Sequence, residues 1–248
     1  MFDLMKKRVL VFTPTYNELE NIEFWLELVI SQGDSDILVV DDSSRDGTTE
    51  LLRVKARQVP RLKLIVRESK IGIGSAHQDA LKFAVEKGYD LLITLDADLS
   101  HDPRDINRFI NASEGVNYIV GTRSDGGRNE LTGIRWMLSK GANLVCRVMI
   151  PTGLTEYTTS YRCYDRQAML FLASNPPKGE GYSYFIETTD MLYRGGLKLA
   201  EIPIVFRDRL HGKSKIPNLQ AFKSCIVILK LTFIRVTRKR SKSYQNKL

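Results

Sequence analysis

The 248-residue sequence predicts an α/β protein built on one mostly parallel sheet with helices on both faces. Two observations predict it. Short apolar segments alternate with amphipathic segments through the first half of the chain, and polar or acidic clusters follow three of the apolar segments. The composition agrees, because 43% hydrophobic and 27% charged residues are typical of a folded globular protein rather than a disordered one.

The first half of the chain predicts each strand and helix in turn. Apolar runs predict strands at 8–13, 37–40, 62–66, 91–95 and 118–121. Helical spacing of apolar residues predicts helices at 18–30, 48–58 and about 76–85, with a further helix that starts at Asp102-Pro103. Such apolar strands indicate a sheet that is covered on both faces.

The second half is less regular. We expect helices near 134–149 and 184–194, separated by a polar stretch at 156–162. No repeat or long linker is visible, so residues 1–216 are interpreted as one domain and 217–248 as a C-terminal appendix.

Several protein classes are excluded. No apolar run approaches the roughly 18–20 residues that span a bilayer, and the run at 9–12 is too short for the core of a signal peptide. The sequence has three cysteines, an odd number, and they are widely spaced: Cys146, Cys163 and Cys225. This pattern argues against a disulfide framework or a thiolate zinc site. A reducing cytoplasm is therefore the expected compartment.

An acidic pair, Asp96 and Asp98, follows the fourth predicted strand. In an extended chain, residues i and i+2 face the same side, so both carboxylates would converge while Ala97 points away. Oxygen ligands suit Mg²⁺ or Mn²⁺, which also bind phosphate oxygens of a substrate. The alternative is a solvated turn that leads into Pro103.

A second acidic pair, Asp41-Asp42, follows the second predicted strand. Asp42 fits either a contact to a nucleotide base or ribose, or a local Asx turn and helix N-cap; the N-cap role is also expected for Asp46. A phosphoacceptor receiver domain would place such a pair after the first strand, which instead ends in Pro14-Thr15-Tyr16.

These motifs together resemble family 2 glycosyltransferases of the GT-A fold. The shared segments are PTYNE at 14–18, VVDDSSRDGT at 39–48, GIG at 72–74 and DADLSH at 96–101. Three later segments resemble the dolichyl-phosphate mannosyltransferase branch: VGTR at 120–123, LSKGAN at 138–143 and FRDRLHGKSK at 206–215. The resemblance covers about residues 8–215.

The resemblance implies roles for individual residues. The nucleoside of the sugar donor would be held by Pro14, Tyr16, Glu18, Val40 and Asp42. The metal and diphosphate would be held by Asp96, the Ala97 backbone and Asp98. The basic groups around the donor and acceptor phosphates would be Arg123, Arg209 and Lys215, with Arg135 as a further phosphate-binding arginine. Taken singly, Arg123, Arg209 and Lys215 would each be interpreted as solvated surface charge, and it is their place within matched motifs that favours the phosphate role.

The resemblance also implies the reaction. A hexose, mannose by this resemblance, would pass from a nucleotide sugar such as GDP-mannose to a polyprenyl or dolichyl phosphate, with inversion to a β-linked product. A lipid phosphate is already an anion, so it needs no general base, and Mg²⁺ or Mn²⁺ with arginines and a lysine would stabilise the leaving diphosphate. The sequence leaves open whether the base is guanine or uracil.

Two alternatives stay open. The acceptor could be a hydroxyl of a glycan or lipid-linked saccharide, with Glu187 or Asp190 as general base, or the chain could be a non-catalytic nucleotide-sugar-binding subunit. The stretch 156–162 departs from the branch, because Glu156 replaces an Asp, a glycine is missing and Thr159 is β-branched. This departure bears on the acceptor and sugar more than on the reaction class.

The C-terminal appendix bears on location. Six basic residues and no acidic residue follow position 234, so most of the net charge of +8 lies in the last 14 residues. Before them, a helix from Pro217 would carry a wide apolar face formed by Phe222, Ile226, Leu229, Phe233 and Val236. This pattern fits a helix that lies on an anionic membrane or on a membrane-protein partner, at the cytoplasmic face, or alternatively a core-packing helix with a solvated tail. No stacking platform or groove-reading helix accompanies the charge, so nucleic acid is not an expected partner.

Overall fold

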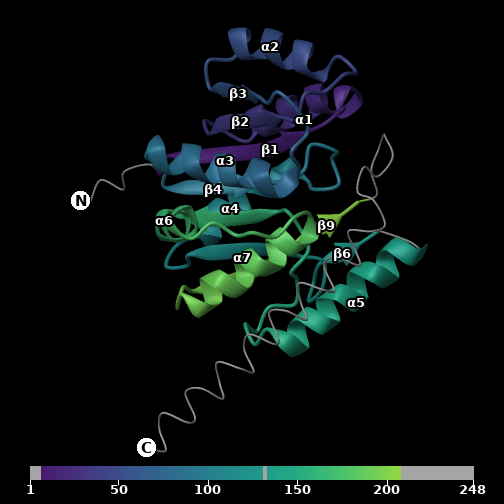
Figure 1. The fold of residues 1–248 in the computed structure, drawn as a ribbon, viewed down its shortest axis with the longest axis vertical. Coiled ribbons are helices and arrows are strands. Elements are labelled where there is room, and N and C mark those ends of the chain that lie inside the picture. The colour runs from purple at the N-terminus through teal and green to yellow at the C-terminus, as the bar shows by residue number, and fades with distance from the viewer. Residues whose placement is uncertain (1–6, 131–132, 208–248) are drawn as a thin grey trace, which may run out of the picture.

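The computed structural model of the protein describes residues 7–130 and 133–207, and its centre is a seven-stranded sheet (Figure 1). The strand order across the sheet is β3-β2-β1-β4-β7-β5-β8. The strands are β1 Val9–Thr15, β2 Asp36–Asp41, β3 Leu62–Val66, β4 Leu91–Thr94, β5 Tyr118–Thr122, β7 Arg162–Asp165 and β8 Leu199–Pro203. The short strands β6 Arg128–Asn129 and β9 Val205–Phe206 pair with each other in parallel.

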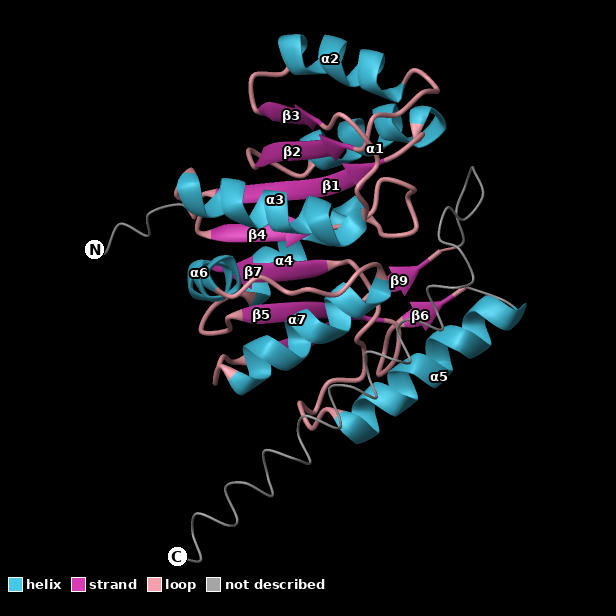
Figure 2. Ribbon diagram, in the orientation of Figure 1, coloured by secondary structure: helices cyan, strands magenta, loops and turns pink. Residues whose placement is uncertain are grey.

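Helices cover both faces of the sheet (Figure 2). The helices are α1 Leu19–Ser31, α2 Thr48–Gln58, α3 Ile73–Glu86, a 3₁₀ turn Pro103–Asp105, α4 Ile106–Ala112, α5 Gly133–Met149, α6 Arg166–Ser174 and α7 Tyr182–Arg194. One hydrophobic cluster joins the sheet to α3, α6 and α7, and the other joins it to α1, α2 and α4. Because both faces are covered, the strands β1, β2, β4 and β5 consist mostly of buried residues, whereas most residues of the outermost strands β3 and β8 are only partly buried.

The direction of the strands decides where a site can form. β7 runs antiparallel to β4 and β5, and the other six strands of the sheet run in one direction. The carboxyl ends of β1, β2, β4 and β5 therefore meet at one edge of the sheet, and β7 begins at that edge. Ligands of open α/β sheets bind there, and so all the segments that lead into this edge are candidates for the site.

The expected fold class is confirmed. The five predicted strands and the helices of the first half all form, with ends that differ by a few residues. The strands β6, β7, β8 and β9 and the helix α6 were not predicted. In the described part of the chain, no helix is long and apolar enough to cross a bilayer. The predicted C-terminal helix and the boundary at 216 lie outside the described residues.

Candidate active site

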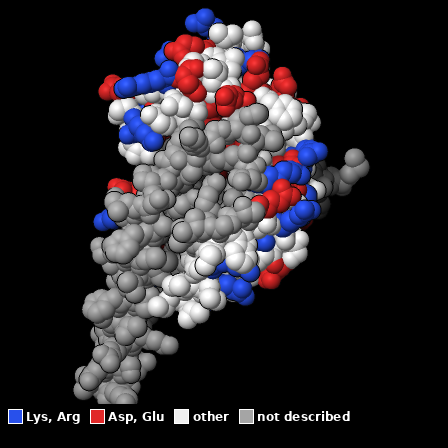
Figure 3. All heavy atoms as spheres, turned by 90° about the vertical axis from the view of Figure 1, so that its right-hand side faces the viewer, with Lys and Arg blue, Asp and Glu red and all other residues white. Residues whose placement is uncertain are grey.

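The carboxyl edge of the sheet brings together most of the residues predicted to bind a nucleotide. Pro14 of β1 pairs with Val40 of β2, and Thr15 pairs with Asp41. Tyr16 and Asp42 follow these two strands directly. Seen from this edge, the described surface carries both acidic and basic side chains (Figure 3). The nucleoside residues predicted from the sequence are therefore neighbours in space.

The two acids at the end of β2 have different surroundings. Asp41 is fully buried and accepts hydrogen bonds from the hydroxyls of Thr15, Ser44 and Thr49 at 2.5–2.7 Å. Asp42 accepts a hydrogen bond from Arg67 at 2.8 Å and one from the backbone N–H of Gly72 at 2.9 Å. Asp41 thus fixes the turn after β2, while Asp42 ties that turn to the loop before α3.

The segment after β1 is held to the turn after β2 by side chains that bind backbone. Asn17 has a φ of 57°, and its side chain accepts a hydrogen bond from the Arg45 N–H at 2.9 Å. The Glu18 N–H donates to the Thr48 hydroxyl at 2.9 Å. The Lys70 ammonium lies 3.9 Å from the centre of the Tyr16 ring. These contacts place Tyr16 beside the loop before α3 and Glu18 beside the start of α2.

The acidic pair after β4 lies at a turn that includes residues 97–98 and not on an extended segment, while the convergence of the two carboxylates stays a prediction. Leu99 has a φ of 62°, a left-handed conformation that is uncommon for a leucine and that reverses the chain. The Asp98 side chain is buried and accepts hydrogen bonds from the N–H and hydroxyl of Ser100 at 3.1 and 2.6 Å. The Asp96 side chain is 29% exposed. The Asp98 carboxylate is therefore fixed by hydrogen bonds within its own turn, and the Asp96 carboxylate reaches the surface.

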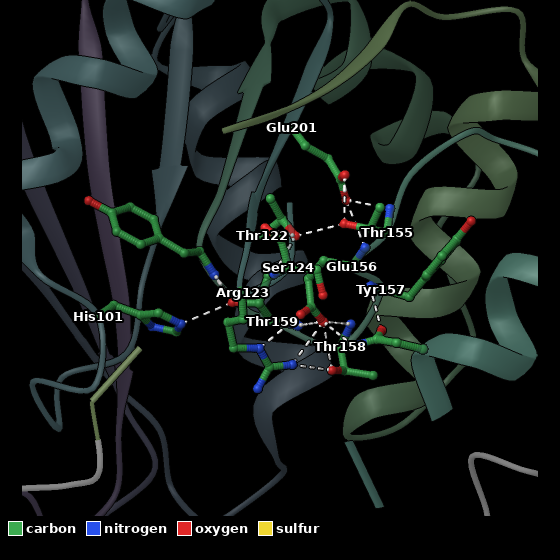
Figure 4. A network of polar contacts seen from close by, with 12 residues as sticks. His101, Thr122, Arg123, Ser124, Thr155, Glu156, Tyr157, Thr158, Thr159 and Glu201 are labelled. Carbon is green, nitrogen blue, oxygen red and sulfur yellow. Dashed lines mark hydrogen bonds and ion pairs between the residues drawn. The ribbon is translucent and has the colours of Figure 1, made fainter. Parts of the chain in front are cut away.

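Arg123, which follows β5, forms a two-pronged ion pair with Glu156 (Figure 4). Both hydrogen bonds are 2.8 Å long, and Arg123 also donates to the Thr158 hydroxyl at 2.7 Å. Burial alone would raise the pKa of Glu156, but the Arg123 guanidinium and further hydrogen bonds lower that pKa to about 2. Arg123 was predicted as a phosphate ligand; two of its guanidinium nitrogens hold Glu156, and the phosphate role stays a prediction.

Sequence reasoning missed the network around Glu156. One oxygen of this carboxylate also accepts hydrogen bonds from the Asn143 side chain at 2.9 Å and from the backbone N–H groups of Thr158 and Thr159 at 2.9 and 3.2 Å. Glu201 of β8 supports the same segment by accepting from the N–H groups of Thr155 and Glu156 (Figure 4). The replacement of Asp by Glu at 156 was the signal that pointed here.

A second missed residue is His101. Its imidazole is fully buried between the turn after β4 and the segment before β7, and contacts both. Burial lowers the pKa of His101 to about 4, although nearby Asp98 opposes this shift, so the ring is neutral at physiological pH. His101 ends the motif at 96–101, but no pattern in the sequence gave this residue a role of its own.

A cavity of about 390 Å³ lies between α5 and the Glu156 segment. Residues that line it include Arg123, Trp136, Lys140, Asn143, Arg147 and Glu156. Three of these are cationic and one is anionic, so the cavity suits an anionic group that lies next to apolar surface.

Comparison with known proteins decides the family. The family model described as Glycosyl transferase family 2 matches residues 10–171. The chain belongs to this family. An undecaprenyl-phosphate mannosyltransferase from Micrococcus luteus is 34% identical over 215 residues, which are 84% of this chain and 87% of that protein. A polyprenol monophosphomannose synthase from Mycolicibacterium smegmatis is 34% identical over 218 residues, which are 84% and 81% of the two chains.

A solved structure supports the fold of this family 2 protein. The mannosyltransferase PcManGT from Pyrobaculum calidifontis, in complex with GDP-Man and Mn²⁺, matches with a TM-score of 0.55 at 20% identity. The match covers 95% of this chain and 65% of that one. The expected GT-A fold is confirmed, and at this identity the likeness concerns the fold alone.

The acidic turn of this glycosyltransferase suits a divalent metal. Asp96 and Asp98 offer carboxylate oxygens. Both hydrogen bonds from Ser100 go to the same oxygen of Asp98, Oδ1. In the ranges that the structure describes, no group of three or more metal-ligating side chains gathers. In proteins, Mg²⁺ commonly combines one or two carboxylates with substrate phosphates and water.

The side chains of Glu187 and Asp190, considered as general bases, have structural partners. Glu187 accepts hydrogen bonds from the N–H groups of Lys178 and Gly179 at 2.9 and 2.6 Å. Asp190 is buried and pairs with Arg194 at 2.8 Å. Both carboxylates fix the ends of α7, so no observation favours the hydroxyl-acceptor alternative. Arg209 and Lys215 lie outside the described residues, as does the side chain of Arg135.

Proposed function

We propose that this chain transfers a mannosyl group from GDP-mannose to a polyprenyl phosphate with inversion at the anomeric carbon. One observation carries the proposal: the acidic turn at 96–98 and the cationic cavity beside Arg123 lie at the same edge of the sheet. The two bacterial relatives whose names specify polyprenyl-phosphate mannosyl transfer, matched over 84% of this chain, support the choice of substrates.

The proposed reaction needs two anionic groups brought together. Asp42, Tyr16 and the ends of β1 and β2 would bind the nucleoside, and Asp96 and Asp98 would hold Mg²⁺ or Mn²⁺ against the diphosphate. When bound, this ion stabilises the negative charge that leaves with the nucleoside diphosphate. Metal dependence is therefore part of the proposal.

The acceptor phosphate would enter the cavity beside α5. Lys140 and Arg147 line it together with Arg123, and Arg209 and Lys215 remain predicted partners for the phosphates. A phosphate monoester is already a nucleophilic anion at neutral pH, so orientation by these cations replaces a general base. A single displacement of this kind inverts the anomeric configuration.

A transfer assay tests the proposal directly. Purified protein is incubated with Mn²⁺ or Mg²⁺, radiolabelled GDP-mannose and polyprenyl phosphate, with UDP-sugars in parallel, and label is counted in the organic phase. We expect label from GDP-mannose only when metal and lipid are present, and loss of at least a hundredfold in Asp96→Asn. The matched control is Glu20→Gln, an exposed acid on α1. Absence of lipid-linked label with every donor would overturn the proposal.

We further propose that the protein associates peripherally with the cytoplasmic face of an anionic membrane. On α5, Met137, Leu144 and Val148 recur at helical spacing and are 63–76% exposed. Lys140 and Arg147 line the cavity next to this stripe, and α5 carries no acidic residue. Apolar side chains beside cations are the pattern that binds the interface of an anionic bilayer. The segment 217–248, proposed as a separate membrane-facing unit, would add to this surface.

Vesicle binding tests the membrane proposal. The double variant Leu144→Ser/Val148→Ser should bind vesicles of phosphatidylglycerol several-fold more weakly than wild type in a sedimentation assay. The control Phe24→Ser/Val54→Ser replaces two exposed apolar residues on α1 and α2 and should bind as wild type does. Equal binding by both double variants would contradict a membrane contact through α5.

A further inference from the structure

Two loops of the candidate site face each other across one imidazole. The first is the acidic turn after β4, and the second is the segment at 155–161 that leads into β7. The backbone N–H of Asp96 donates to Nδ1 of His101 at 3.3 Å, and Nε2 of the same ring lies 3.0 Å from the Thr159 hydroxyl. His101 therefore contacts the proposed metal-binding turn with one nitrogen and the acceptor-side segment with the other.

The two contacts define the state of the ring. Because Nδ1 accepts a hydrogen bond, the proton of the neutral imidazole lies on Nε2, which donates to the Thr159 hydroxyl. Tyr161 and Phe206 pack on the ring, with centroids 5.3 and 5.1 Å away. Burial and contact with two aromatic rings restrict the movement of the imidazole, so we expect a displacement of either loop to be passed to the other.

Thr159 continues the connection to the cationic side of the site. Its N–H donates to Glu156 at 3.2 Å, and Glu156 holds Arg123 through two hydrogen bonds. An unbroken series of hydrogen bonds thus runs from the Asp96 backbone through His101, Thr159 and Glu156 to Arg123. Figure 4 shows its part from His101 to Arg123.

A purely structural tether between the same loops already exists. The Thr94 hydroxyl donates to the Ser160 carbonyl at 2.5 Å, which ties the end of β4 to the segment before β7. His101 is therefore not required merely to join the loops. What it adds is a bond to the backbone of Asp96, one of the two proposed metal ligands.

We propose that His101 is a positioning residue that, through Thr159, sets the acidic turn in register with the Arg123–Glu156 pair, so that a change on the acceptor side alters donor binding. This inference rests on the proposed function for the identity of the two sides. It predicts that a substitution in the acceptor-side segment changes the affinity of a site in the turn after β4.

The test compares two substitutions at one buried position. Thr159→Val keeps the shape of the side chain and removes its hydroxyl, whereas Thr159→Ser keeps the hydroxyl. We expect Thr159→Val to bind GDP or UDP with Mn²⁺ roughly threefold to tenfold more weakly by titration calorimetry, the effect of losing the buried hydrogen bond to His101. The other bond lost, from the Tyr161 N–H at 3.3 Å, lies within the acceptor-side segment itself. Thr159→Ser should restore wild-type affinity to within about twofold. Equal affinity of the two variants would overturn the inference.

A second pair of variants keeps the inference testable if Thr159→Val does not fold. His101→Asn keeps an acceptor near the Asp96 N–H but is too short to reach Thr159, and should weaken nucleotide binding as Thr159→Val does. The double variant should be no weaker than either single one, because both remove the same link. The control Thr94→Val removes the other tether and should leave the nucleotide affinity within about twofold of wild type. An additive double variant, or an equal loss in Thr94→Val, would contradict the inference.

The binding readout separates this inference from the proposed function. If the chain does not transfer mannose to lipid, wild type fails the transfer assay while its nucleotide affinity still responds to Thr159→Val. If the inference fails, wild type transfers mannose and the nucleotide affinity of Thr159→Val equals that of Thr159→Ser.

Discussion

The two halves of the site are held in place in different ways. On the nucleotide side, Asp41 and Asp42 are fixed by hydroxyls and backbone N–H groups of nearby turns and by Arg67 at the end of β3. On the acceptor side, Glu156 is held by Arg123, which lies 33 residues away in the sequence, and by Asn143 of α5. Each half contains a buried ion pair, Asp42–Arg67 on the nucleotide side and Glu156–Arg123 on the acceptor side, but the Glu156 side chain is only 1% exposed whereas that of Asp42 is 9% exposed. The acceptor side should therefore be the more fragile of the two.

The largest effect is expected where the acceptor-side ion pair is broken. Glu156→Gln leaves the Arg123 guanidinium buried without its charge partner, and should lower the free energy of unfolding by about 3 kcal/mol. Urea unfolding measures this free energy. The control is Glu20→Gln at an exposed position, whose free energy of unfolding should lie within about 0.5 kcal/mol of wild type. A loss below about 1 kcal/mol in Glu156→Gln would mean that the two halves are equally robust.

Lowering the pH should also destabilise the protein through the Glu156–Arg123 pair. The folded pKa of Glu156 is about 2, below its ordinary value of 4.5, so its contribution to stability is complete above pH 4.5 and is lost as the pH falls toward 2. A shift of this size corresponds to about 3 kcal/mol. Urea titrations between pH 6 and pH 2.5 should show a smaller fall in unfolding free energy for Glu156→Gln than for wild type. Parallel curves for the two proteins would contradict the assignment.

A smaller effect is expected at Arg162, a fully buried cation at the start of β7. Its guanidinium donates to the carbonyls of Tyr157, Thr159 and Phe185 and to the hydroxyls of Tyr118 and Thr189. Arg162→Lys keeps the charge but cannot reach all of these acceptors, and should cost about 2 kcal/mol of unfolding free energy. Mannosyl transfer should fall more than GDP binding does. A greater loss of GDP binding would place Arg162 with the nucleotide half.

The smallest effect is expected on the nucleotide side. Lys70 is exposed and lies over Tyr16, and a cation–π contact at such a site contributes about 0.5–1 kcal/mol. Lys70→Ala should therefore change the affinity for GDP by less than about fivefold and leave the melting temperature unchanged. Calorimetry and thermal unfolding measure both. A tenfold loss of affinity would show that this half also depends on single side-chain contacts.

The difference between local and long-range contacts explains which parts of the fold and the site could be predicted from the sequence. The strands β1 to β5 and their turns follow from local apolar runs, and the residues at their ends were correctly placed at one edge. Strand β7 has only four residues, one of them Arg162, and forms because it pairs with both β4 and β5. Its flanking segment forms contacts with His101 and Arg123 that no local pattern encodes. The hydrogen bonds and ion pairs between residues far apart in the sequence could therefore not be predicted.

The acidic pair after β4 was located correctly, and of the two backbone conformations considered for it, the structure contains the turn. Two acids separated by one residue indicated a shared face, whereas the left-handed Leu99 and the bonds from Ser100 turn the chain at this point. Sequence spacing located the pair, the backbone conformation determines its geometry, and its role as a metal site stays a prediction.

A structure of the protein with GDP-mannose and Mn²⁺ tests the central claim, that both halves form one mannosyl-transfer site. The account predicts an anomalous Mn²⁺ peak that contacts the carboxylates of Asp96 and Asp98 and the diphosphate, with the sugar directed toward the cavity beside Arg123. A nucleotide bound elsewhere, or a metal that contacts neither acid, would contradict it.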